Sequence, residues 1–298
     1  MSITQKWKRA WRYIRKGIPV ENKIVQQTTA NIVSLSVNEL LKGRVAIVTG
    51  GTSGIGYSIA EAFLNSGARV VITGRSEDRL QSAVCQLKEA THVSEDKIYG
   101  VVLDNSKPET FMDKFIEIRK LLGGNTCIDI LVNNAGVLGG HIINTTEEQF
   151  DTVLDTNLKG VFFLSRLLAK HMKNNGIKGN ILNIASSSSL RPAVSAYTLS
   201  KWGLRGLTLG LAKALIPFGI VVNGVAPGPT ATPMLIKDNS GNIDLPSSPA
   251  GRYALPEEIA NMAVVLVSDM GRMVIGDIVY MTGGTAVVTY EDMKYPFY

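Results

Sequence analysis

Apolar residues after residue 44 form two alternating patterns. Short apolar runs rich in β-branched residues alternate with longer segments in which apolar residues recur every three or four positions. The first pattern is typical of buried strands and the second of amphipathic helices. The expected strands are Val45–Val48, Val70–Thr73, Lys97–Leu103, Ile128–Val132, Asn180–Ile184, Ile220–Val225 and Ile278–Met281. The expected helices are Tyr57–Leu64, Glu77–Ala90, Glu109–Leu122, Thr146–Lys173, Ala196–Ile216 and Pro256–Val267.

This alternation predicts an α/β protein with a seven-stranded parallel sheet covered by helices on both faces, a doubly wound fold. The chain has 298 residues, of which 45% are hydrophobic, as expected of a globular protein with a sizeable core. No second core is left over, so residues 44–298 are expected to form one domain.

Residues 1–43 form a basic N-terminal extension. Six Lys and Arg residues and no acidic residue lie within residues 1–20, and they account for the net charge of +6. Trp7, Trp11, Ile14 and Ile18 are spaced to share one face of a helix. Such a basic amphipathic helix fits docking on the body of the protein or on a sister subunit, adsorption on anionic lipid, or binding to a partner protein.

The rest of the chain is balanced in charge, which argues against nucleic acid as a partner. No secretory signal or membrane-length apolar stretch is evident, and the two cysteines suggest no disulfide framework. We therefore expect a cytoplasmic protein. The three scattered histidines form no ligand cluster, so we expect no metal site.

A glycine-rich turn follows the first expected strand and precedes a helix. It reads Thr49-Gly50-Gly51-Thr52-Ser53-Gly54-Ile55-Gly56. Glycines permit a sharp turn and a close approach of the helix, whose N-terminus can then bind a pyrophosphate through free N–H groups and its dipole. The turn is therefore a candidate dinucleotide site, with contacts expected from Gly50, Thr52, Ser53, Gly54, Ile55 and Gly56.

The turn resembles the TGxxxGxG motif of the short-chain dehydrogenase/reductase family, in its compact single-domain branch. Further matches in family order are Asp104, the segment Asn133-Asn134-Ala135-Gly136, Asn157, the pair Tyr197 and Lys201 in YxxxK spacing, and Pro227-Gly228 with Thr230 and Thr232. The resemblance implies a Rossmann-type fold and a nicotinamide cofactor. It also implies cofactor contacts from Asp104 and Asn105 at the adenine and from Asn133, Ala135 and Gly136 near the adenine ribose. Near the nicotinamide it implies contacts from Tyr197, Lys201, Pro227, Gly228, Thr230 and Thr232.

The second expected strand indicates which dinucleotide is bound. It ends in Thr73-Gly74-Arg75, without the acidic residue that grips the ribose 2′-hydroxyl of NAD. Arg75 can instead pair with a 2′-phosphate. NADP(H) is therefore expected to be preferred over NAD(H), although the glycine turn lacks the basic residue that many NADP-dependent members carry.

Tyr197 and Lys201 lie four residues apart and share a helix face. A nearby ammonium favours the phenolate and tunes a tyrosine for general acid–base catalysis. By resemblance, Lys201 also holds the nicotinamide ribose, and Asn157 holds water in a proton relay. The family's substrate-orienting serine corresponds best to Ser186, with Ser187 and Ser188 as alternatives.

The substrate is expected to lie between Val137–Ile143, Leu190–Val194 and a Pro- and Gly-rich segment, Met234–Tyr253. The candidate lining residues are apolar: Leu138, Ile142, Val194, Met234 and Leu235. Arg191 and Arg252 are relevant only if they point inward.

The sequence thus predicts an NADP-dependent oxidoreductase that transfers a hydride between the nicotinamide and a carbonyl or alcohol carbon of a small molecule, with Tyr197 as general acid or base. The alternatives are a catalytically silent cofactor-binding regulatory protein and an NAD-dependent alcohol dehydrogenase. An epimerase or dehydratase fits less well, because its glycine spacing and C-terminal domain differ. The resemblance also implies a homodimer or homotetramer.

Overall fold

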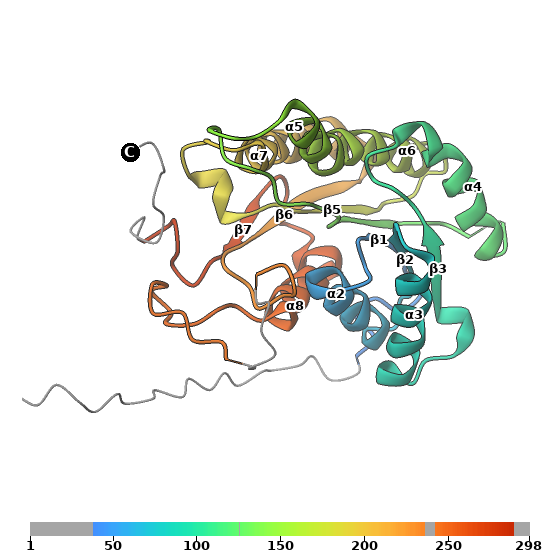
Figure 1. Ribbon diagram of the computed structural model, residues 1–298. Helices are drawn as coiled ribbons and strands as arrows, with labels where there is room; N and C mark the ends of the chain where they lie inside the picture. The colour runs from blue at the N-terminus through green and yellow to red at the C-terminus, as the bar shows by residue number, and fades with distance from the viewer. Residues whose placement is uncertain (1–37, 125, 236–241, 289–298) are drawn as a thin grey trace, which may run out of the picture.

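A seven-stranded parallel sheet forms the centre of the protein (Figure 1). The computed structural model describes residues 38–124, 126–235 and 242–288. The strands, in the spatial order β3-β2-β1-β4-β5-β6-β7, confirm the predicted doubly wound topology. Their bounds are β1 Val45–Thr49, β2 Arg69–Gly74, β3 Ile98–Val102, β4 Ile130–Asn133, β5 Asn180–Ile184, β6 Val221–Pro227 and β7 Ile278–Met281.

Helices cover both faces of this sheet. One face carries α2 (Gly54–Asn65), α3 (Glu77–Thr91) and α8 (Pro256–Val267). The opposite face carries α4 (Phe111–Leu121), α5 (Glu147–Leu154), α6 (Gly160–Asn174) and α7 (Ala196–Leu215). None of the helices in the described ranges is both long and apolar enough to cross a bilayer.

Alternate residues of the strands supply two hydrophobic layers. In β1, Ala46 and Val48 pack toward α2, α3 and α8, whereas Val45 and Ile47 pack toward α4 and α6. All five β1 residues are buried. A parallel strand covered on both faces therefore reads as a continuous apolar run, which is why the sequence pattern identified it.

The folded domain begins before Arg44. Leu41 is fully buried in the layer beneath α2, and its N–H donates to the Ser66 carbonyl over 2.8 Å. The end of the predicted extension is therefore part of the core. The amphipathic segment at residues 1–20 and the aromatic C-terminal residues 290–298 lie outside the described ranges.

The predicted helical stretch Thr146–Lys173 is interrupted by a π-helical turn, Asp155–Lys159, which separates α5 from α6. A π turn inserts one extra residue into the helical hydrogen-bond ladder. The spacing of apolar residues on either side stays close to helical, so the pattern did not reveal the insertion. The turn buries Thr156 and Asn157.

Parallel strands direct their carboxyl ends to one edge of the sheet. The strand order reverses between β1 and β4, since the chain continues outward from β1 to β2 and β3 before it returns to β4. The loops after β1 and β4 therefore diverge there, and such a switch point leaves a crevice for ligands.

Candidate active site

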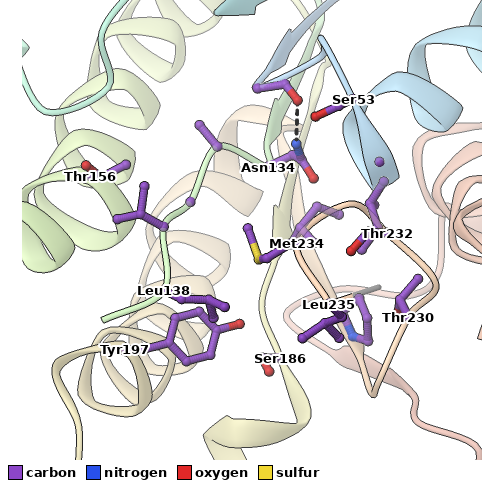
Figure 2. Close-up of a pocket in the computed structure, with 18 of the residues that line it drawn as sticks. Ser53, Asn134, Leu138, Thr156, Ser186, Tyr197, Thr230, Thr232, Met234 and Leu235 are labelled. Atoms are coloured by element: carbon purple, nitrogen blue, oxygen red, sulfur yellow. Dashed lines mark hydrogen bonds between the residues drawn. The ribbon is translucent and has the colours of Figure 1, made fainter. Parts of the chain in front are cut away.

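A cavity of about 510 Å³ lies at the carboxyl ends of the strands (Figure 2). Most of the predicted cofactor and catalytic residues line it: Gly50, Thr52, Ser53, Gly54, Ile55, Arg75, Asn105, Ala135, Gly136, Ser186, Tyr197, Lys201, Pro227, Gly228, Thr230 and Thr232. Four predicted residues, Gly56, Asp104, Asn133 and Asn157, do not line it. The cavity therefore joins motifs that lie far apart in the sequence.

The glycine turn is held in a conformation that side chains would disturb. Gly50 and Gly54 have φ values of +64° and +56°, the left-handed region that favours glycine. A Cβ on Gly50 would lie 2.9 Å from Ala135 Cα, and one on Gly56 would lie 2.4 Å from the Gly50 carbonyl oxygen. Gly56 thus permits the close approach of α2 without touching the cavity itself.

Asn134, which the sequence analysis did not select, fastens this turn to the loop after β4. Its Nδ2 donates to the carbonyls of Thr49 (2.9 Å) and Gly50 (3.1 Å), the latter drawn in Figure 2. The Thr49 hydroxyl oxygen accepts from the Asn134 and Ala135 N–H groups over 3.0 Å each. The two loops are thus held as a rigid unit at the start of α2.

Two arginines line the cavity beyond the end of β2. Arg75 was predicted, and Arg79 in the first turn of α3 was missed. Arg75 and Arg79 are four residues apart at the start of a predicted helix, and this spacing was the signal that could have identified Arg79. A Cβ on Gly74 would approach Thr52 Cγ2 to 2.8 Å, so the position before Arg75 has little room for an acidic side chain.

Asp104 and Asn105 have separate roles. The Asp104 carboxylate accepts from the Ser106 N–H (3.0 Å) and hydroxyl (2.8 Å), and its side chain stays out of the cavity lining. Partial burial raises the pKa of Asp104, but the Ser106 hydrogen bonds and the charges of Arg75 and Lys107 outweigh this and lower it. Asn105 lines the cavity, and its Nδ2 donates to the Thr156 carbonyl over 3.1 Å.

The structure does not bring the Asn133 side chain into the cavity. This residue ends β4 and is 1% exposed; its Nδ2 donates to Ser165 Oγ and Asn183 Oδ1, each over 2.9 Å. Asn183 in turn donates to the Thr208 hydroxyl. The Asn133 side chain thus points into the protein. It links β4 to α6 and to β5, and through Asn183 to α7, rather than contacting a ligand.

Tyr197 and Lys201 stand in the first two turns of α7, whose N-cap is Ser195. The Tyr197 hydroxyl is directed into the cavity, near Ser186 (Figure 2). Lys201 is 5% exposed, and its Nζ donates to the Ile184 carbonyl over 2.9 Å and lies 5.6 Å from the centre of the Tyr197 ring. The end of β5 and the start of α7 thus bring the three polar groups together.

Burial is the largest influence on the pKa values of Tyr197 and Lys201. It raises the pKa of Tyr197, and a hydrogen bond with the Ser186 side chain partly offsets this by lowering it. Burial also lowers the pKa of Lys201 to about 8. At neutral pH the tyrosine is therefore a neutral hydroxyl that can donate a proton, and the lysine is still mainly an ammonium.

Among the candidate serines, Ser186 is the one bonded to Tyr197. Its Oγ also accepts from the Ser188 N–H over 3.1 Å, as the N-cap of the short 3-10 turn η4 (Ser187–Leu190). Ser187 and Ser188 line the cavity as well. The contact with Tyr197 favours Ser186 as the orienting hydroxyl.

Asn157 lies outside the cavity lining and holds part of the cavity wall in place. Its Oδ1 accepts from the Val137 N–H (2.8 Å), and its Nδ2 donates to the Val137 carbonyl (2.9 Å) and Ser200 Oγ (3.2 Å). The π turn thus places an amide that fixes the loop after β4 against α7. Val137 itself lines the cavity.

All three segments predicted to surround the substrate contribute to the cavity lining, but fewer of the named apolar residues do so than predicted. Leu138, Met234 and Leu235 line it (Figure 2). Ile142 and Val194 do not: their backbones pair, Ile142 N–H to Val194 carbonyl over 3.0 Å, and the Ile142 side chain is 59% exposed.

Of the two arginines considered for this end, only Arg191 lines the cavity, and it is 4% exposed. Arg252 instead forms a two-point ion pair with Glu258, at 2.9 and 2.7 Å. Within the described residues there is no group of three His, Cys, Asp or Glu side chains that could hold a metal ion.

Comparison with known proteins places this arrangement in a family. The family model described as short chain dehydrogenase matches residues 44–243. The chain is 36% identical to a 3alpha-hydroxysteroid dehydrogenase of Mediterraneibacter gnavus, over 82% of this chain and 97% of the relative. It is 35% identical to an NADP-dependent (R)-specific alcohol dehydrogenase of Lentilactobacillus kefiri, over 83% and 98%.

A solved structure agrees with these relatives. A short chain dehydrogenase from Burkholderia cenocepacia J2315 in complex with NADP superposes with a TM-score of 0.71 at 31% identity, covering 82% of this chain and 98% of that one. The chain therefore belongs to the short chain dehydrogenase family and is an oxidoreductase that acts on CH–OH or C=O groups.

Proposed function

We propose that this enzyme is an NADP(H)-dependent carbonyl reductase or alcohol dehydrogenase in which Tyr197 exchanges the proton. The observation that carries the proposal is one cavity with Ser186, Tyr197 and Lys201 at one end and Arg75 and Arg79 at the other. This arrangement matches a ligand with a reactive end and an anionic end, as a phosphorylated dinucleotide has.

The residues present fit such a cofactor. The glycine turn leaves no space for side chains where the backbone must approach a pyrophosphate, and Ser53 at the N-cap of α2 makes no side-chain capping bond. Asn105, Ala135 and Gly136 line the same cavity. Thr230 and Thr232, with Pro227 and Gly228, line the same cavity, and Thr232 lies next to Gly54 of the glycine turn.

The bound cofactor supplies or accepts the hydride, and the protein handles the proton. In the direction of reduction, the Tyr197 hydroxyl donates a proton to the substrate oxygen, while Ser186 donates a hydrogen bond to that oxygen as its charge grows. The raised pKa of Tyr197 keeps its hydroxyl protonated before the reaction. The Lys201 ammonium stabilises the phenolate that remains.

The preference for NADP(H) rests on Arg75 and Arg79. Two guanidinium groups at the end of β2 can form charge-assisted bonds with a 2′-phosphate, and Gly74 stands where an acid would repel it. The relative from Lentilactobacillus kefiri is NADP-dependent, and the Burkholderia structure holds NADP. Both support the same choice here.

Titration of the protein with NADPH and NADH, followed by nicotinamide fluorescence, tests this choice. We expect tighter binding of NADPH, and we expect Arg75→Ala combined with Arg79→Ala to weaken NADPH by about 10- to 100-fold with little change for NADH, since each guanidinium lost removes a charge-assisted bond. Equal affinities in the wild type, or equal losses in the double variant, would remove the basis for NADP(H). Absence of binding of either dinucleotide would overturn the proposed function.

A further inference from the structure

Three large apolar side chains lie in the cavity near the reacting hydroxyls without being buried themselves. Leu138, Met234 and Leu235 line the cavity and are 50%, 48% and 47% exposed. Figure 2 shows Leu138 and Leu235 on either side of the Tyr197 hydroxyl. A single exposed leucine is ordinary on a protein surface, but exposed apolar side chains gathered in one cavity mark a site for an apolar ligand.

The fold places these side chains on two loops. Leu138 follows β4, whereas Met234 and Leu235 follow β6. In the sheet, β5 lies between β4 and β6, and it leads to Ser186. A substrate oxygen held by Ser186 therefore has apolar side chains available from the loops on both sides.

The charged residues of the cavity favour a neutral substrate. The described lining residues include no carboxylate that could pair with a cationic substrate. In the proposed function, Arg75 and Arg79 serve the dinucleotide and Lys201 serves the tyrosine. Arg191 is 4% exposed and already has an interaction within the protein. An ion placed against the apolar side chains without a partner would be costly to bury.

We infer that the substrate is a neutral ketone, or the corresponding secondary alcohol, that carries an extended apolar group. Leu138, Met234 and Leu235 contact that group, while Ser186 and Tyr197 bind the oxygen. In reduction the carbonyl carbon receives the hydride and the oxygen receives the Tyr197 proton, which solvent then replaces, so the product is the secondary alcohol. This inference rests on the proposed function, because it names the substrate class of the same site.

A homologous series of methyl ketones tests the inference. The alkyl chain is lengthened one methylene at a time, from ethyl to octyl, and NADPH oxidation is followed. Each methylene that enters the apolar surroundings should raise kcat/KM by about fourfold, mainly through a lower KM, because its transfer out of water strengthens binding by about that factor. Ketones of equal length that end in a carboxylate or an ammonium group should have a kcat/KM at least about 10-fold lower.

Two substitutions locate the apolar contacts. Leu138→Asn and Leu235→Asn keep a branched side chain but make it polar, and in the double variant the factor per methylene should fall to about twofold or less. Leu121→Asn is the matched control. Leu121 is 44% exposed on α4 and does not line the cavity, so the full factor persists in this variant.

Several results would overturn the inference. They are a kcat/KM that does not rise with chain length in the wild type, faster reaction of the charged ketones, an undiminished factor in the double variant, and reduction of none of the ketones. If the double variant fails to fold by circular dichroism, the wild-type series and the charged ketones decide.

The proposed function and the substrate class fail in different ways. A protein that binds neither dinucleotide in the fluorescence titration contradicts the proposed function. A protein that binds NADPH and reduces ketones without a dependence on chain length contradicts only the substrate class.

Discussion

At the scale of single residues, the site contains ionisable side chains whose burial disfavours their charged form. Lys201 is almost fully buried beside a tyrosine, and its ammonium is kept near the reacting groups by one bond to the Ile184 carbonyl. Stability alone would favour an apolar side chain there. The presence of a buried lysine at this position is therefore a sign of function.

Replacement of Tyr197 by Phe isolates the proton step. The ring still packs beside Lys201, whereas the hydroxyl that bonds with Ser186 is lost. We expect turnover to fall by about 10²- to 10⁴-fold, the usual contribution of a positioned general acid. NADPH affinity, measured by fluorescence, should change little. Turnover close to that of the wild type would show that another group supplies the proton.

Replacement of Lys201 by Met should stabilise the protein while abolishing turnover. With the pKa of Lys201 lowered to about 8, keeping the group buried costs up to about 3 kcal/mol below pH 8. Loss of the bond to Ile184 offsets part of this, so we expect a net gain of about 1 to 2 kcal/mol in urea unfolding at pH 7.

The stability gained in Lys201→Met should shrink as the pH rises. Between pH 8 and about 10.4 the unfolded lysine holds its proton while the folded one loses it, so the wild type recovers stability as the pH rises. The advantage of Lys201→Met should therefore shrink between pH 7.5 and 9.5. A variant less stable than the wild type at pH 7, or an advantage independent of pH, would contradict this account.

The sequence predicted most of the residues that line the cavity but not the direction of every side chain. Ser186 and Tyr197 occupy the cavity as expected from their motifs, whereas Asn133 points into the protein and Asn157 fixes the Val137 backbone. Arg79 was missed. A motif records which residue stands at a position, but side-chain direction depends on tertiary neighbours that no local pattern contains.

At the scale of elements, strands and helices were predicted best where burial alone defines them. β5, β7 and α8 have the expected bounds. The π turn at Asp155–Lys159 was not foreseen, because it shifts hydrogen bonds between backbone groups without altering the apolar spacing. The boundary after residue 43 missed Leu41, since a single apolar residue before a strand gives no periodic signal.

The N-terminus of α7 offers a test at this scale. Ser195 Oγ accepts from the Thr198 N–H over 3.1 Å, in the turn that carries Tyr197. We expect Ser195→Ala to cost about 1 kcal/mol of stability in urea unfolding, as loss of an N-cap does. Because the first turn carries Tyr197, kcat should also fall several-fold.

The control is Thr146→Ala at the N-cap of α5, where Thr146 Oγ1 accepts from the Gln149 N–H over 3.2 Å. It should cost a similar free energy of unfolding without lowering kcat, since Thr146 is not in the cavity lining. If both variants lower kcat equally, the effect reflects general loosening and not the position of Tyr197.

At the scale of the whole molecule, apolar side chains are exposed on the helices after β4 and β5. Phe162 on α6 and Leu199, Trp202 and Leu209 on α7 are each between 42% and 53% exposed. We expect these helices to pair subunits in a homodimer or homotetramer. Light scattering should give a mass of two or four chains, and Phe162→Glu with Leu209→Glu should lower it, because buried charges oppose association. A wild-type monomer would refute this.

The described residues that line the cavity include four cationic side chains, and this charge has an electrochemical consequence. An oxidised nicotinamide ring bears a positive charge that the reduced ring lacks, so in the proposed arrangement it would be repelled by the Lys201 ammonium. The reduced dinucleotide should then bind more tightly than the oxidised one, and binding should raise its midpoint potential. An enzyme of this design would take up the reduced form readily and expel the spent one, which favours sustained flux in the direction of reduction.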